Sequence, residues 1–295
     1  MRRVRISKAP LERIGISPAR ERFDSLEPPL IMGIVNVTPD SFSDGGLHYG
    51  TDEAVEHALS LVERGADMID VGGESTRPFA REVSVEEEKA RVIPVIDRLR
   101  DMVEVPISID TRHVEVAREA VEAGASIIND VNALRGPGMD EFAAESGCSV
   151  VVMHMKGTPG NMQVSPVYDD VVEEVLTFLS ERVDHLTGMG VERELIMIDP
   201  GIGFGKRVSD NLRLLRELHR FRETGCPVLV GASRKSFIGK VLDLDVSQRL
   251  EGSIASAVIA YVNGASVLRV HDVEETRRAL DIARAVVEAP TRWDT

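Results

Sequence analysis

The sequence is poor in cysteine, and its two cysteines lie far apart. Cys148 and Cys226 each stand just before an apolar run, and neither has the spacing of a metal ligand. This pattern argues against a cysteine-based metal site. We expect both residues to be small buried side chains in a reducing cytosol.

Long apolar runs and an excess of positive charge are also absent. No stretch approaches the roughly 20 apolar residues that a membrane-spanning helix needs. The basic start of the chain has neither the apolar centre nor the cleavage-like site of a secretory signal. The formal net charge of −14 argues against general binding to nucleic acid or anionic membranes, since both require a positive field. We therefore expect a cytoplasmic protein with neither kind of partner.

What the sequence does contain is a series of short apolar segments rich in β-branched residues. Each segment is hydrophobic almost throughout rather than alternating, which is typical of strands buried on both faces of a parallel sheet. The eight predicted strands begin at Leu30, Ala66, Val105, Ala125, Ser149, Glu194, Cys226 and Ala265.

Helical patterns fill the gaps between these segments. Apolar residues recur at helical spacing in residues 51–64, 169–186, 211–221 and 253–262. Ser84 and Glu87 have the spacing of a capping box ahead of another helix. Three strands are preceded by a glycine, at positions 65, 124 and 264, and glycine suits a helix end because it tolerates positive φ.

Eight strands alternating with helices could form a doubly wound sheet or a closed barrel. The barrel is favoured because every predicted strand ends in polar or glycine-rich residues, and a barrel gathers all its strand ends on one face. A doubly wound sheet would concentrate them at one switch point. We predict an α/β fold: a single-domain (β/α)8 TIM barrel in residues 30–290, with residues 1–29 as a short N-terminal extension that could cap the barrel bottom.

The first group of candidate site residues offers hydrogen-bond acceptors. Asp110, Asn129 and Asp199 each end a predicted strand. A carboxylate can accept two parallel N–H bonds from a flat heterocycle that bears an amino group. Taken alone, an Asp at a strand end is a helix cap or turn residue about as often as it is a site residue. The occurrence of polar chemistry at all eight strand ends favours a site over independent caps.

The second group is cationic and suits an anion such as a diphosphate. Asn36 could add a neutral oxygen ligand to a Mg²⁺ that also holds phosphate oxygens. The GIGFGK run at 201–206 lacks the spacing and final Ser or Thr of a nucleoside triphosphate loop. Taken alone, a histidine here is more often structural, and an arginine could pair with a surface acid. The cationic group consists of Arg77, Lys235, Arg269 and His271, with the hydroxyl of Thr76 beside them.

Seven spaced motifs occur from about residue 31 to 273: NVTPDSFSDGG, DVGGESTRP, SIDT followed by IND, MHM with GTPGNMQ, DPGIGFGK, SRKSFIG and RVHDV. These motifs, in this order, closely resemble those of the dihydropteroate synthase family. The resemblance implies a barrel that joins a dihydropterin diphosphate to 4-aminobenzoate in folate synthesis. It also implies a homodimer that sulfonamides target.

Carried over by position, the resemblance implies three subsites. The pterin would be bound by Asp110, Asn129, Met153, Asp199 and Lys235. The diphosphate would be bound by Asn36, Thr76, Arg77, Arg269 and His271, with Asn36 as the ligand to Mg²⁺. The 4-aminobenzoate would be surrounded by Phe42, Pro78, Phe204, Lys235 and Ser236.

The chemistry of the implied reaction indicates which residues would be catalytic. An arylamine is neutral at pH 7 and already nucleophilic, so the difficult step is cleavage of the C–O bond. Mg²⁺ and the cations Arg77, Lys235, Arg269 and His271 would stabilise the departing charge. We hypothesise that Asp40 stabilises the cation that develops at the pterin methylene.

Two other functions share parts of this pattern. A pterin-dependent methyltransferase acting with a corrinoid protein would keep the pterin-binding acids but would need neither the cationic group nor the TPDSFSDGG loop. A non-catalytic pterin-binding homologue should have lost residues of the loop or of the anion site. The chain retains all of them.

Overall fold

The structure of the chain is a computed structural model. It describes residues 29–38, 46–75, 82–158, 160–162, 164 and 166–289. The predicted N-terminal extension therefore lies outside the described residues, apart from Pro29, and its role stays a prediction.

The described strands form one parallel sheet that curls into a nearly closed barrel. Their order is β6-β5-β4-β3-β2-β1-β8-β7, so neighbours in sequence are neighbours in space and no switch point occurs. A bridge between Ile198 and Val228 brings the two edges together, and the Ile198 N–H donates to the Pro227 carbonyl at 3.0 Å. The predicted barrel is confirmed. The strands are β1 Leu30–Asn36, β2 Met68–Gly72, β3 Ile107–Asp110, β4 Ile127–Asp130, β5 Ser149–Met153, β6 Ile196–Asp199, β7 Leu229–Val230 and β8 Val267–Val270.

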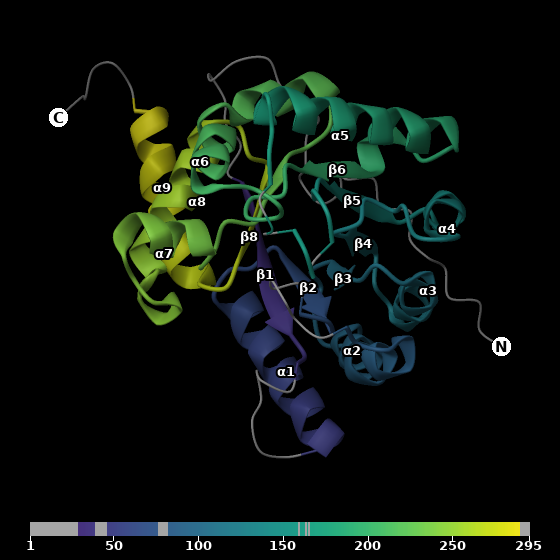
Figure 1. The fold of residues 1–295 in the computed structure, drawn as a ribbon. Helices are drawn as coiled ribbons and strands as arrows, with labels where there is room; N and C mark the ends of the chain where they lie inside the picture. The colour runs from purple at the N-terminus through teal and green to yellow at the C-terminus, as the bar shows by residue number, and fades with distance from the viewer. Residues whose placement is uncertain are drawn as a thin grey trace.

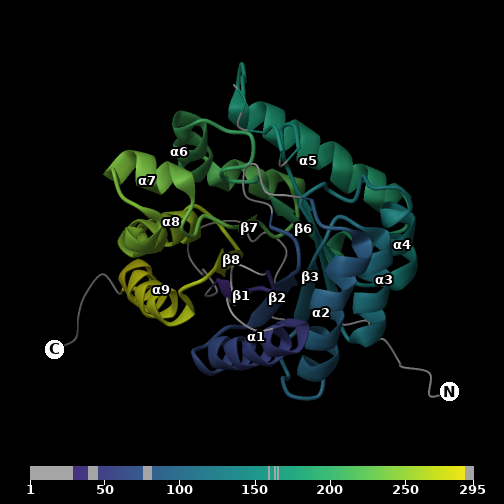
Figure 2. The same cartoon turned by 60° about the horizontal axis from the view of Figure 1, so that its bottom comes forward.

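Helices surround the barrel on the outside (Figures 1 and 2). They are α1 Gly46–Glu63, α2 Val85–Leu99, α3 Val114–Ala123, α4 Met139–Ser146, α5 Val171–Gly188, α6 Val208–Arg216, α7 Ser236–Leu242, α8 Leu250–Val262 and α9 Val273–Val287. Short 3-10 helices cover Arg193–Leu195, Leu218–Thr224 and Val246–Gln248. Within the described residues, no helix is long and apolar enough to cross a membrane.

The helix ends follow the local signals in the sequence. The Ser84 hydroxyl accepts the Glu87 N–H at 3.3 Å and so caps α2. The predicted helix over 211–221 is divided, because α6 ends at Arg216 and a 3-10 helix follows. Residues three apart lie on the same side of a 3-10 helix, and this winding buries both Leu218 and Phe221. The three glycines ahead of strands have positive φ: 98° at Gly65, 131° at Gly124 and 104° at Gly264.

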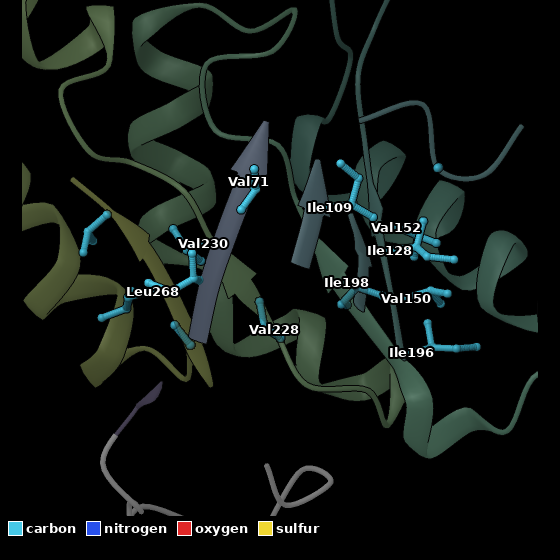
Figure 3. Packing of buried hydrophobic residues seen from close by; sticks show 14 of the residues in the cluster. Val71, Ile109, Ile128, Val150, Val152, Ile196, Ile198, Val228, Val230 and Leu268 are labelled. Carbon is cyan, nitrogen blue, oxygen red and sulfur yellow. The ribbon is translucent and has the colours of Figure 1, made fainter. Parts of the chain in front are cut away.

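The outward side chains of the strands form the main hydrophobic core with the helices. Figure 3 shows Val71, Ile109, Val150 and Val230 among them. Each of these side chains is at most 1% exposed. Burial of the outward face explains why the strands read as continuous apolar runs rather than as alternating ones.

The inward side chains form a separate apolar layer inside the barrel. Successive residues of a strand point to opposite faces, so the next inward position lies two residues further along each strand. At those positions the sequence changes from apolar to mostly polar residues. The apolar layer consists of Met32, Met68, Ile127, Val151, Met197, Leu229 and Val267.

Candidate active site

The candidate site lies at the carboxyl ends of the strands, directly above the apolar layer. Two positions beyond that layer stand Asp70 on β2, Asn129 on β4, Met153 on β5, Asp199 on β6 and Arg269 on β8. The period of two in a strand therefore explains why these residues from distant parts of the chain meet inside one barrel.

Arg269 connects two of the acidic residues. Its Nε donates to Asp70 Oδ2 at 2.6 Å, and its Nη2 donates to Asp110 Oδ2 at 2.7 Å. The guanidinium fork thus joins β8 to β2 and β3 with charge-assisted hydrogen bonds. The predicted heterocycle acceptors and the predicted anion-binding cations are consequently in direct contact.

Asp70 also fixes the orientation of Asn129. Asn129 Nδ2 donates to Asp70 Oδ2 at 3.2 Å, and both side chains are buried. An ionised carboxylate only accepts hydrogen bonds, so the amide must turn its NH₂ group toward Asp70. The Asn129 carbonyl oxygen then points away from Asp70 as an acceptor for a ligand N–H.

The protonation of the site is set by burial together with close charges. Burial raises the pKa of Asp110 to about 7, although Arg269 acts in the opposite direction. Burial lowers the pKa of Lys235 to about 7, opposed by Asp199. Burial also raises the pKa of Asp199. Burial alone would lower the pKa of Arg269, but the carboxylates of Asp70 and Asp110 raise it, so Arg269 stays charged.

Lys235 and Phe204 pack together beside Asp199. The Lys235 Nζ lies 4.0 Å from the centroid of the Phe204 ring and donates to the Ile202 carbonyl. Asp199 Oδ1 accepts the Gly201 N–H at 2.7 Å, which holds the carboxylate in place. Ser236 is exposed and starts α7 next to Lys235.

His271 and Asn36 complete the described part of the predicted site. His271 Nδ1 lies 3.0 Å from Ser233 Oγ, and this contact orients the imidazole. Asn36 ends β1, in register with Gly72 at the end of β2. The predicted residues Asp40, Phe42, Thr76, Arg77 and Pro78 lie outside the described residues.

Three polar residues of the barrel mouth had no assigned role in the sequence. Asp70 is completely buried in the middle of an apolar strand, which requires a partner because an unpaired buried charge is costly. That requirement is the signal by which it could have been found. His154 and Lys206 are also buried and contact one another.

The sequence matches the family model of pterin-binding enzymes over residues 32–271. This range runs from β1 to the end of β8 and includes every described residue of the candidate site. The chain belongs to this family of barrel enzymes.

Similar proteins of known name place the chain more specifically within this family. The dihydropteroate synthase of Escherichia coli (strain K12) is 51% identical over 264 residues, which cover 90% of this chain and 94% of that protein. The structure of Xanthomonas albilineans dihydropteroate synthase with 4-aminobenzoic acid matches with a TM-score of 0.85 at 51% identity, covering 90% of this chain and 95% of that one. The Yersinia pestis dihydropteroate synthase, solved with a sulfonamide drug complex, matches with a TM-score of 0.85 at 46% identity, covering 90% and 96%. Within the pterin-binding family, the chain is thus one of the dihydropteroate synthases, which are transferases of folate synthesis.

Proposed function

We propose that the protein joins (7,8-dihydropterin-6-yl)methyl diphosphate to 4-aminobenzoate, giving 7,8-dihydropteroate and diphosphate. The amine nitrogen bonds to the pterin methylene, the C–O bond breaks, the diphosphate leaves with the electron pair, and the amine proton is released. One observation carries the proposal: Arg269, one of the cations predicted to bind the diphosphate, donates hydrogen bonds to Asp70 and Asp110. The acceptor side of the site (Asp110, Asn129 and Asp199) therefore adjoins its cationic side. A substrate with a heterocycle and a diphosphate spans such a junction.

The pterin half of the substrate would occupy the acceptor side. Asp110, Asn129 and Asp199 present oxygens to its N–H groups, and Lys235 donates to its ring oxygen or nitrogen. Met153, 3% exposed at the end of β5, contributes an apolar contact to the ring. A flat ligand here exchanges water for fixed, already oriented acceptors.

The diphosphate would lie against Arg269 and His271, with Thr76 and Arg77 from the segment after β2. The described residues hold no group of three or more His, Cys, Asp or Glu that could bind a metal. A Mg²⁺ held by the Asn36 amide oxygen, substrate phosphates and water fits this donor set, because Mg²⁺ is usually bound by few protein ligands together with phosphates. When bound, Mg²⁺ would neutralise charge on the leaving group.

The 4-aminobenzoate would bind between the aromatic and cationic residues near β6 and β7. Phe204, Lys235 and Ser236 form the described part of this subsite, and Phe42 and Pro78 would complete it. The X. albilineans relative was solved with 4-aminobenzoic acid, and the Y. pestis relative with a sulfonamide drug complex. We expect sulfonamides to compete for the same place here.

The chemical step needs a stabilised leaving group more than a base. Arg77, Lys235, Arg269 and His271 would offset the growing negative charge, while Asp40 would stabilise the cationic pterin methylene. Loss of one such electrostatic contact commonly costs about 10²–10³ in rate. Replacement of Asp40 by Asn should therefore lower kcat much more than pterin affinity, and a normal kcat would remove Asp40 from this role.

We also propose that the protein is a homodimer and acts in the cytoplasm. Exposed apolar side chains gather on the neighbouring helices α7, α8 and α9, where Leu242 is 47%, Ile259 50% and Ile282 69% exposed. Exposed apolar surface of this kind favours contact between protein molecules. Light scattering on the purified protein should give twice the chain mass, and a monomer at micromolar concentration would contradict the proposal.

The reaction is tested by product formation. The protein is incubated with both substrates and Mg²⁺, and 7,8-dihydropteroate is measured by chromatography, with each component omitted in turn. Product that requires all three components is expected. If a known dihydropteroate synthase makes product under these conditions and this protein does not, the proposed reaction is refuted and the two alternatives remain. Methyl transfer from methyltetrahydrofolate would instead indicate the corrinoid-dependent alternative.

A further inference from the structure

Lys206 is a buried lysine just behind the candidate site. It ends the glycine-rich run after β6, and its side chain is 3% exposed. Its Nζ lies 2.9 Å from His154 Nδ1, 3.2 Å from the His154 carbonyl and 3.0 Å from the Phe204 carbonyl. A lysine ammonium has three N–H donors, and each has an acceptor here.

Burial of the Lys206 amine costs free energy of desolvation, so the contacts that offset this cost are informative. Burial lowers the pKa of Lys206 well below its usual value, although Asp199 opposes this shift. No carboxylate in the described part of the chain forms an ion pair with Lys206; its partners are two carbonyls and an imidazole. A lysine at the surface would avoid this desolvation cost. Its contacts instead connect the end of β5 to the loop after β6.

The loop that Lys206 holds is packed tightly on the end of β5. Gly201 has a φ of +69°, and a Cβ there would lie 1.9 Å from the His154 carbonyl oxygen. Gly205 has a φ of +63°, and its Cβ would lie 2.4 Å from the Lys156 carbonyl oxygen. Glycine is required at both positions because of the backbone angle and because of the close approach.

The β5 side of this contact is itself well supported. The His154 ring packs edge-on against Phe178, with centroids 5.0 Å apart. Tyr168 donates from its hydroxyl to the Gly205 carbonyl at 2.7 Å. Burial, followed by the charge of Lys206, lowers the pKa of His154 to about 2, so the imidazole stays neutral. Lys206 therefore contacts a neutral His154 side chain that is held in place by its packing against Phe178.

On its other side the loop meets Lys235. Lys235 donates to the Ile202 carbonyl and lies over the Phe204 ring at 4.0 Å. Phe204 is thus held by its carbonyl through Lys206 and by its ring through Lys235. A movement of the Phe204 backbone would therefore also move the ring that the Lys235 ammonium contacts.

We propose that Lys206 is a positioning residue for the arylamine subsite: it clamps the Phe204 carbonyl against His154 and thereby sets the place of the Phe204 ring and of Lys235. The inference rests on the proposed function, because it concerns how the same site accepts its second substrate. The pterin acceptors Asp110 and Asn129 stand on β3 and β4, and none of the hydrogen bonds of Lys206 involves them. A shift of the loop would reach the pterin only through Asp199 and Lys235.

The test is a Lys206→Met variant, which keeps much of the side-chain length but has no donor. We expect the KM for 4-aminobenzoate to rise about tenfold or more, since a displacement of about 1 Å can cost up to about 10²-fold. Lys235 and Asp199 contact the same loop and are also assigned to the pterin, so the KM for the pterin diphosphate should rise too, but by much less. His154→Gln, which keeps a side-chain acceptor, should behave closer to wild type than His154→Phe, which has none. Lys240→Met, at an exposed lysine on α7, is the matched control and should change neither KM.

Equal increases in both KM values, or no increase in either, would overturn the positioning role. If Lys206→Met does not fold, the comparison of the two His154 variants decides, because a lost acceptor alone should then raise the 4-aminobenzoate KM. The proposed function is judged separately by wild-type turnover in the same assay. An active wild type with an unselective Lys206→Met variant would refute only this inference.

Discussion

Arg269 and Asp70 form an ion pair in the centre of the barrel mouth, with Nε donating to Oδ2 at 2.6 Å. Asp70 is completely buried, and Arg269 reaches from it to Asp110. This pair holds the Arg269 guanidinium beside the residues that would bind the pterin. It also explains why an aspartate interrupts the apolar run of β2.

Removal of the Asp70 carboxylate should therefore damage both stability and activity. Breaking a buried pair by removing one partner costs about 3–5 kcal/mol, and Asp70→Ala should cost about 3 kcal/mol because Arg269 keeps Asp110. Urea denaturation measures this loss. Glu274→Gln, in the exposed pair with Arg278, is the control and should leave the midpoint unchanged. Similar midpoints for both variants would mean that the central pair does not hold the barrel mouth together.

The pH dependence of kcat/KM for the pterin diphosphate should be bell-shaped near neutrality. The ionised fraction of Asp110 grows as pH rises through its pKa of about 7, which should increase binding. The charged fraction of Lys235 falls as pH rises through its pKa of about 7, which should decrease binding. This ratio reports groups of the free enzyme. In Lys235→Arg the alkaline limb should move to higher pH, and an unmoved limb would assign it to another group.

Gly201 should not accept a side chain. In Gly201→Ala the new methyl group would collide with the His154 carbonyl, so the loop carrying Phe204 must shift and turnover should fall at least about 10²-fold. Gly225→Ala is a close control, since its φ of +72° resembles the +69° of Gly201 and the nearest atom to the added Cβ is 4.0 Å away. That variant should lose about 1 kcal/mol of stability through backbone strain alone and keep its turnover. Comparable kinetic losses in both variants would argue against close packing at Gly201.

The two cysteines should be inert in the folded protein. Both thiols are free and buried, as the sequence led us to expect. Burial raises the pKa of Cys148, and it raises that of Cys226 to about 11, so little thiolate forms at pH 8. A chromogenic thiol reagent should react with neither residue in the native state and with both in guanidinium chloride. Rapid native labelling would show that one of them is accessible.

The barrel could be predicted from the sequence because its buried strands and its helix ends are both specified by neighbouring residues. The eight apolar runs indicate strands buried on two faces, and the glycines at 65, 124 and 264 indicate helix ends that need positive φ. The site acceptors Asp110, Asn129 and Asp199 were found because they stand at or next to strand ends.

The supporting contacts could not be predicted, because they depend on which way side chains point across the barrel. Lys206 follows a glycine-rich loop and could equally have faced solvent or a phosphate. Its contact with His154, 52 residues away, depends on the packing of that loop against β5. Asp70 and Arg269 are 199 residues apart, and neither residue's neighbours in sequence indicate the other.

The most direct test measures ligand binding to the pterin side and to the diphosphate side of the site separately by calorimetry. The ligands are 6-hydroxymethylpterin for the first side and inorganic diphosphate plus Mg²⁺ for the second. Asp199→Asn should weaken binding of the pterin about tenfold or more, equivalent to about 1.4 kcal/mol, and leave diphosphate binding nearly unchanged. His271→Gln should do the reverse. If both variants weaken both ligands equally, or if neither variant weakens either ligand, the assignment of a pterin side and a diphosphate side to this barrel mouth is wrong.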